Sequence, residues 1–104
     1  MPFIILAHDK PNSERLRAKL RSRHIAYLCD RKGQMLAGGA VLDEVGNAIG
    51  GMIILDTEDR AAAERFVGED PFTTGGLFGS IQILAWRKTF FDRQRILLEA
   101  PPSS

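Results

Sequence analysis

The pattern of apolar and polar positions predicts a chain that alternates between strands and helices. Residues 3–8 are nearly all apolar, which indicates a buried strand. The Pro11-Asn12-Ser13-Glu14 segment then supplies a turn, a cap candidate and an acidic first turn for a helix. This helix is expected from about residue 13 to residue 32, because leucines recur at helical spacing until Gly33 provides a stop.

The middle of the chain predicts a hairpin. Residues 34–42 and 48–56 are two strand candidates, and residues 43–47 between them contain the glycine and asparagine that suit a hairpin loop. The two strands are therefore expected to be antiparallel neighbours.

A second, shorter helix is predicted after the hairpin. Residues 56–59 place a cap and acidic side chains at its start, and Gly68 ends it. Its inward face is formed by Ala62, Ala63, Phe66 and Val67. Asp70-Pro71 breaks any continuation, so residues 73–76 are expected to form a loop.

Residues 79–87 predict the last strand and complete a single domain over residues 1–88. Residues 89–104 are a C-terminal extension. Its Phe90-Phe91 pair and the Arg95-Ile96-Leu97-Leu98 segment indicate a short helix, which precedes a frayed end.

The order βαββαβ predicts an α+β, ferredoxin-like fold, with a four-stranded antiparallel sheet and both helices on one face. The predicted strands are apolar at nearly every position, whereas a sheet with one wet face would alternate. Because two helices cover only one face, we expect a homodimer that forms through the open sheet face.

Composition removes several classes of function. The 104 residues carry 14 basic and 13 acidic side chains, a formal charge of +1, which gives no strong case for nucleic-acid or membrane binding. The first residues are too briefly apolar for a signal peptide or a spanning segment, so a cytoplasmic location is the default expectation. The single cysteine, Cys29, excludes an internal disulfide and a CxxC motif.

His24 is the residue that most directly suggests chemistry. It continues the row Leu16, Leu20 and Leu28 at four-residue spacing, so it is expected to point toward the sheet or the groove beside it. Histidine, with an ordinary pKa of about 6.5, transfers protons in either direction at neutral pH. The alternative is a histidine hydrogen-bonded within the core for purely structural reasons.

Asp70 and Asp9 are the two carboxylates that the predicted topology brings toward His24. Asp70 precedes a proline, which favours an extended backbone at the entrance to the last strand, although aspartate is also common in ordinary turns. Asp9 ends the first strand and either caps the following turn or lines the site. The sequence does not decide which of the two contacts His24.

Glycines and aromatic residues mark a possible pocket. Gly38-Gly39 and Gly50-Gly51 lie in or beside the central strands, where glycine indicates a bulge or a close approach, from a ligand or from a dimer contact. Phe72 is a candidate for a pocket wall or for ordinary core packing. The histidines and carboxylates show no metal-ligand spacing, so neither a metal nor another cofactor is expected.

The pattern resembles the YciI-like (YCII-related) family over about residues 3–88. The resemblance rests on the opening strand, on the helix segment around His24, on Met35-Leu36-Ala37-Gly38-Gly39 and on Glu69-Asp70-Pro71-Phe72. The chain departs from the family's shorter members in its tail after Lys88, and it has Ala40 where some members carry proline.

The resemblance implies a dimeric α+β barrel with an active site at His24 and Asp70. Related enzymes on this scaffold, similar to muconolactone isomerases and to a dehydrochlorinase, transfer protons on small cyclic compounds. The hypothesis is therefore a cofactor-free lyase, isomerase or dehalogenase-like enzyme acting on a small molecule. His24 would be its general acid/base, and Arg21, Asp9, Gly39 and Phe72 would contact the substrate. The alternative is a non-catalytic small-ligand-binding or dimerisation module.

Overall fold

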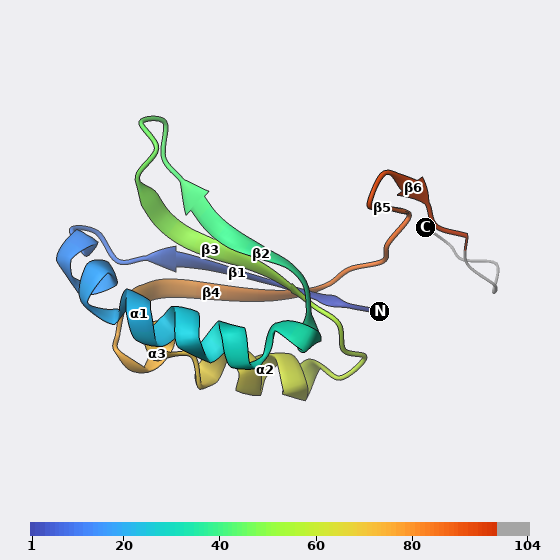
Figure 1. Cartoon of the computed structure of the whole chain (residues 1–104), viewed down its shortest axis with the longest axis horizontal. Helices are drawn as coiled ribbons and strands as arrows, with labels where there is room; N and C mark the ends of the chain where they lie inside the picture. Colours follow the sequence, from blue (N-terminus) through green and yellow to red (C-terminus); the bar gives the residue numbers. More distant parts are fainter. Residues whose placement is uncertain (98–104) are drawn as a thin grey trace.

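The computed structural model describes residues 1–97 and contains a four-stranded antiparallel sheet with helices on one face (Figure 1). The sheet has the order β2-β3-β1-β4. Its strands are β1 (Phe3–Asp9), β2 (Met35–Leu42), β3 (Ala48–Leu55) and β4 (Phe78–Ala85). The helices are α1 (Glu14–Asp30), α2 (Arg60–Gly68) and the short α3 (Pro71–Thr74), with a 3-10 turn at Lys32–Gln34. The predicted α+β, ferredoxin-like fold is confirmed, and the predicted strands and first helix differ from these bounds by one or two residues at their ends.

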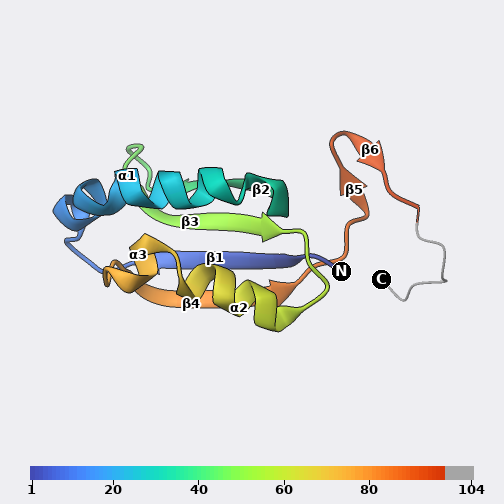
Figure 2. The ribbon, with the colours of Figure 1, turned by 60° about the horizontal axis from the view of Figure 1, so that its bottom comes forward.

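The helices divide the covered face of the sheet between them. Figure 2 shows α1 running along the side of β3, while α2 and α3 lie toward β1 and β4. The main core joins strand residues such as Ile5 and Leu55 to Ala63 and Phe66 of α2, all of them buried. A smaller cluster joins Leu20 of α1 to Phe72 and Leu77. This second cluster fixes α1 against α3, next to the predicted site.

The segment after α2 differs from the predicted loop. Residues 73 and 74 belong to α3, which starts immediately after Asp70. The Asp70 side chain accepts a hydrogen bond from the backbone N–H of Phe72, and Pro71 occupies the first helical position. Both features favour a helix start, so Asp70-Pro71 ends one helix and also begins another.

The predicted C-terminal helix is wrong, because this segment forms a hairpin of β5 (Phe90–Phe91) and β6 (Gln94–Arg95). Asp92 and Arg93 both adopt positive φ angles, 52° and 63°, which is the backbone conformation of a two-residue hairpin turn. Two left-handed residues in succession interrupt a right-handed helix. Figure 1 shows the hairpin standing apart from the sheet. The predicted frayed end, at residues 98–104, lies outside the described residues.

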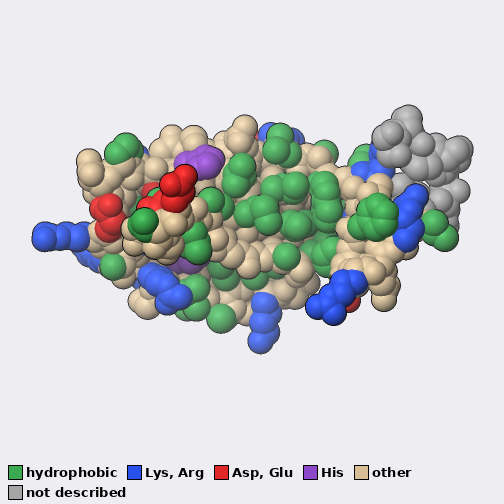
Figure 3. All heavy atoms as spheres, turned by 90° about the horizontal axis from the view of Figure 1, so that it is seen from above, with side chains coloured by type: hydrophobic (Ala, Val, Ile, Leu, Met, Phe, Trp, Pro, Cys, Tyr) green, Lys and Arg blue, Asp and Glu red, His purple; other side chains and the backbone are tan. Residues whose placement is uncertain are grey.

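The face of the sheet away from the helices is mainly apolar, and its polar residues include His8, Ser80 and Gln82. Asp9 is the one Asp, Glu, Lys or Arg in the four strands, and its side chain pairs with Arg17 of α1. Figure 3 shows hydrophobic side chains gathered over the middle of the open face. Among the exposed ones are Met52 and Leu84, at 38% and 47% of their accessible surface. Within residues 1–97, no helix is long and apolar enough to cross a membrane.

Candidate functional site

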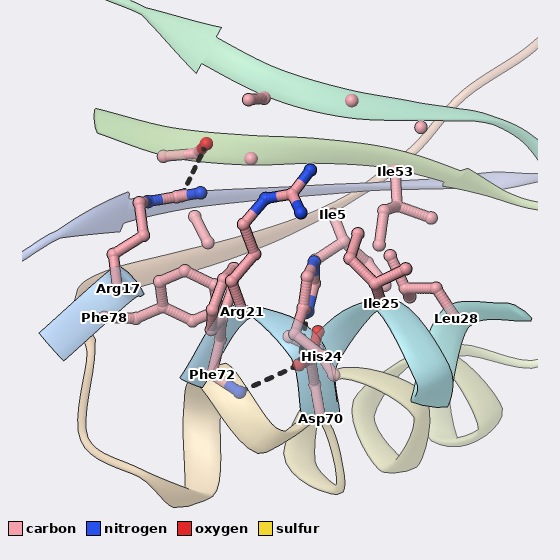
Figure 4. Close-up of a pocket in the computed structure, with 17 residues that line it drawn as sticks. Ile5, Arg17, Arg21, His24, Ile25, Leu28, Ile53, Asp70, Phe72 and Phe78 are labelled. Atoms are coloured by element: carbon pink, nitrogen blue, oxygen red, sulfur yellow. Dashed lines mark hydrogen bonds and ion pairs between the residues drawn. The ribbon is translucent and has the colours of Figure 1, made fainter. Parts of the chain in front are cut away.

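A cavity of about 280 Å³ lies between α1 and the helix-facing side of the sheet. Its apolar walls include Ile5, Leu28 and Ile53, and all four glycines singled out in the sequence line it. The exposed side chains of Arg21 and Ile25 also belong to the lining, so the cavity reaches the surface beside α1. Figure 4 shows the polar groups of α1 and of the α2–α3 turn directed into this space.

His24 and Asp70 form a hydrogen-bonded pair in the cavity wall. The distance between His24 Nδ1 and Asp70 Oδ1 is 2.7 Å. The same Asp70 oxygen accepts the Phe72 backbone N–H at 2.9 Å, and only 2% of Asp70 is exposed. An ionised carboxylate only accepts hydrogen bonds, so this network assigns the proton to His24 Nδ1. The other ring nitrogen, Nε2, has no hydrogen-bond partner among residues 1–97 and carries the free lone pair.

Phe72 holds the imidazole in its orientation. The His24 and Phe72 rings are stacked, with centroids 3.8 Å apart and planes inclined by 10°. Phe72 is itself buried, with Phe78 packed edge-on at 5.9 Å and the Arg17 guanidinium 4.8 Å from its ring centroid. Phe72 is thus both a core residue and a wall of the cavity, so the two interpretations of the sequence are compatible.

Asp9 contacts a residue that the sequence analysis did not single out. Its carboxylate accepts hydrogen bonds from Arg17 Nε at 2.7 Å and from Arg17 Nη2 at 3.2 Å. Arg17 Nη2 also donates to the carbonyl of Gly50 at 2.9 Å. Asp9 is absent from the cavity lining, so among the two candidate carboxylates Asp70 is the partner of His24. The available signal was that Arg17 lies seven residues before His24, two turns away on the same helix face.

Position 50 has no room for a side chain. A Cβ atom at this position would overlap the carbonyl oxygen of Ala7 on β1, which explains one central glycine by close backbone approach. Gly39 lines the cavity, as does Arg21. Arg21, Gly39 and Phe72 therefore lie at the cavity and Asp9 does not, and the contact of these residues with a substrate stays a prediction.

Tyr27 anchors the end of α1 outside this cavity. Its hydroxyl donates to the carbonyl of Phe66 on α2 at 2.6 Å, and the Arg31 guanidinium lies 3.8 Å from its ring centroid. Burial raises the pKa of the Tyr27 phenol, and this effect exceeds the opposing effect of the Arg31 charge. The contact ties α1 to α2 and so keeps His24 in line with Asp70.

Within the described part of the chain, no three His, Cys, Asp or Glu side chains are grouped so as to hold a metal ion. The polar groups that line the cavity are the His24 imidazole, the Asp70 carboxylate and the guanidinium groups of Arg17 and Arg21, and its other walls are mainly apolar. The His24 imidazole can accept a proton at Nε2, and the Asp70 carboxylate stabilises the positive charge that forms on the ring.

The chain is similar to known proteins over most of its length. Residues 1–87 match the model of the YCII-related domain. The chain is 26% identical to an uncharacterised protein of Haemophilus influenzae over 98 residues, covering 86% of this chain and 100% of that protein. The same identity and coverage hold for Protein YciI of Escherichia coli.

Two solved structures share the fold. One is the 5-chloro-2-hydroxyhydroquinone dehydrochlorinase TftG from Burkholderia phenoliruptrix in complex with 2,5-dihydroxybenzoquinone. It matches with a TM-score of 0.77 and 31% identity, covering 84% of this chain and 94% of that chain. The other, PA3566 from Pseudomonas aeruginosa, matches with a TM-score of 0.51 and 17% identity over 84% of this chain and 92% of that one, which concerns the fold alone. The family model spans most of the sequence, and the chain therefore belongs to the YCII-related domain family.

Proposed function

We propose that this protein is an enzyme that transfers a proton on a small organic molecule without a cofactor, with His24 as the general acid/base. The observation that carries the proposal is the 2.7 Å hydrogen bond between His24 and the buried Asp70 in the wall of a cavity. Because Asp70 engages His24 Nδ1, Nε2 is the ring nitrogen left to contact a substrate. Here Nε2 has no partner among the described residues.

The geometry divides the work between the two side chains. His24 Nε2 accepts a proton from the substrate, and the imidazolium that forms is stabilised by the Asp70 carboxylate. Asp70 is a positioning residue, because its carboxylate is engaged by His24 Nδ1 and by the Phe72 backbone N–H and so fixes the tautomer and the ring direction. Stacking on Phe72 also hinders movement of the imidazole perpendicular to its own plane. A base held in this way typically contributes about 10²–10⁴-fold in rate.

The similarity to TftG supports an eliminating or isomerising reaction. That enzyme's name describes the removal of hydrogen chloride from a chlorinated hydroquinone. Loss of hydrogen chloride requires a base for the proton, and an imidazole supplies this function. We propose that the present chain catalyses a lyase, isomerase or dehalogenase-like step of the same kind.

The test uses two assays on the purified protein. Chloride release from 5-chloro-2-hydroxyhydroquinone measures dehydrochlorination, and deuterium exchange from D2O into small cyclic ketones and lactones, followed by NMR, measures proton transfer in general. His24→Gln is expected to lower either rate by about 10²-fold or more. Asp70→Asn is expected to lower kcat more than it raises KM, since it disturbs the base and not the cavity.

His8→Gln is the matched control, because His8 is the chain's other histidine, exposed and absent from the cavity lining. It should retain full activity. A loss of less than tenfold in His24→Gln contradicts the proposal. Ligand binding without turnover in the wild-type protein would instead support the non-catalytic ligand-binding module.

We also propose that the open face of the sheet packs against a second copy of the chain. The face carries no Asp, Glu, Lys or Arg, so it offers nothing to a charged partner. It is apolar across neighbouring strands, because Ile4 and Leu6 of β1 lie opposite Leu84 of β4 and Met52 of β3 respectively. The face also carries the polar residues His8, Ser80 and Gln82, but a largely apolar face still complements itself about a two-fold axis, which favours an identical partner.

Light scattering tests this interface at micromolar concentration. The wild-type chain is expected to have twice its monomer mass. Met52→Asp together with Leu84→Asp should give monomers, because a buried unpaired carboxylate strongly disfavours association. Val45→Asp, at an 83% exposed loop position, is the control and should leave the mass unchanged. A monomeric wild-type chain refutes the dimer.

A further inference from the structure

Two arginines of α1 line the cavity, and only one of them is neutralised by the protein. Arg17 is held by both oxygens of Asp9 and by the Gly50 carbonyl, so its charge and its donors are used. Arg21, one turn further along the helix, makes no hydrogen bond or ion pair within residues 1–97. Figure 4 shows its guanidinium extending into the cavity between Arg17 and His24.

The charge balance of the cavity leaves the Arg21 cation uncompensated. Asp9 balances Arg17, and Asp70 is occupied by His24 and by the Phe72 backbone N–H. No carboxylate in the cavity lining is left for Arg21. A guanidinium presents a planar set of N–H donors that matches a carboxylate, and one beside apolar walls binds an anion more strongly than one in open water.

The sheet side of the cavity is built without large side chains opposite Arg21. Gly38 and Gly51 lie on the helix-facing side of the sheet, where their cross-strand neighbours are Ile53 and Ala7. A Cβ atom would meet its nearest neighbour at 3.4 Å at Gly38 and at 3.6 Å at Gly51, which are ordinary contacts. Unlike Gly50, these two glycines are therefore not required by the packing of the chain.

Glycine within a strand normally reduces stability, since it packs no side chain. At Gly38 and Gly51, the absence of a side chain leaves a shallow space above the exposed backbone. The cavity volume of about 280 Å³ suits one ring with a few substituents, because an apolar cavity of about 150 Å³ already holds benzene. The depth left by the missing side chains suits a flat molecule better than a puckered one.

We propose that the cavity selects small, flat, anionic molecules, with the anion paired to Arg21 and the ring lying against the backbone at Gly38 and Gly51. This inference rests on the proposed function, because it describes the substrate class of the same site. It assigns Arg21 and the two glycines to specificity, and His24 and Asp70 to proton transfer. A ligand held in this way has its edge beside His24 Nε2.

Three probe ligands separate charge from shape. Benzoate is flat and anionic, benzamide is flat and neutral, and cyclohexanecarboxylate is anionic and puckered. Binding to the full chain is measured by NMR shifts of the backbone amides at millimolar ligand concentration. Benzoate is expected to bind at least about fivefold more tightly than either of the others, with its shifts centred on the cavity residues.

Variants test the assigned residues. Arg21→Gln should weaken benzoate binding by about fivefold or more and should remove the preference over benzamide. Arg23→Gln, an exposed arginine of the same helix that does not line the cavity, is the matched control and should bind as wild type. Gly51→Ala should weaken benzoate binding while the urea midpoint is unchanged or higher, since a Cβ atom there makes only an ordinary contact.

The outcomes distinguish this inference from the proposed function. His24→Gln should still bind benzoate, so a protein without turnover can satisfy the inference. Failure of benzoate to shift any cavity residue overturns it, as does equal binding of the three probes. Wild-type affinity in Arg21→Gln overturns the role of the arginine, whatever the rate of proton transfer.

Discussion

The hydrogen bond between the buried Asp70 and His24 should contribute most of the stability at the site, and the Asp70→Ala variant measures this contribution. Asp70 Oδ1 accepts two hydrogen bonds, from the Phe72 backbone N–H as a helix cap and from His24. Loss of a helix cap costs about 1 kcal/mol. Leaving the partly buried His24 N–H without its acceptor costs about a further 1–3 kcal/mol. The free energy of unfolding should therefore fall by about 2–4 kcal/mol, out of the 5–15 kcal/mol that is typical of a domain.

A second helix cap in the chain supplies the matched control. Asp59 accepts the Ala61 backbone N–H at 2.9 Å, the same distance at which Asp70 accepts that of Phe72. The Asp59 side chain is 62% exposed, however, and it contacts no histidine. Asp59→Ala should therefore cost little more than the cap, about 1 kcal/mol, because its ion pair with Arg65 spans 3.9 Å between exposed side chains. The difference between the two variants isolates the contribution of burial and of His24.

Urea unfolding followed by circular dichroism, at one fixed protein concentration, gives the free energies. A double-mutant cycle of Asp70→Ala with His24→Ala should show a coupling of about 1–2 kcal/mol, because each variant removes the same bond. The combination of Asp59→Ala with His24→Ala should be additive. Equal losses for the two aspartates, or additive behaviour within about 0.5 kcal/mol for Asp70 and His24, would refute the reasoning.

Three further predictions concern residues other than the His24–Asp70 pair. Burial raises the pKa of Tyr27 above 10.0, so its contribution to stability is present below pH 10.0 and is lost as the pH rises through the higher pKa of the folded state. Urea unfolding at several pH values should show this loss in the wild-type protein and should not show it in Tyr27→Phe. Hydrogen bonds from Asn47 and Val45 lower the pKa of Asp43 from 3.8. Its stabilisation of the β2–β3 loop is therefore complete above pH 3.8 and is lost as the pH falls through the lower pKa of the folded state. Faster amide hydrogen exchange at Asn47 should report this loss, and Asp43→Ala should show the faster exchange at all pH values. Gly50→Ala should lower the free energy of unfolding by about 1–3 kcal/mol, as overpacking does, because its Cβ would overlap the Ala7 carbonyl, and an unchanged urea midpoint would contradict this.

Local sequence determined the elements and most of their order. Apolar strand runs, the four-residue spacing that includes His24 and the stop at Gly33 are short-range features, and they predict strands and α1 to within one or two residues. The tail was the exception. Its apolar spacing resembles a short helix, but the positive φ angles of Asp92 and Arg93 make a hairpin, and neither residue type announces that conformation as glycine does.

Tertiary structure decided the composition of the site. Asp9 and Asp70 were equivalent candidates in the sequence, since both lie next to strands that end near the same groove. Their partners depend on where α1 crosses the sheet, which places Arg17 over Asp9 and His24 over Asp70. The same long-range packing explains why Gly50 must be glycine while Gly51 need not be, because a Cβ atom at Gly50 would overlap the Ala7 carbonyl of β1, whereas at Gly51 its nearest neighbour is the Gly39 carbonyl oxygen of β2 at 3.6 Å. Spacing along the chain determines which side chains share a face, but the contacts across that face depend on packing between segments far apart in the sequence.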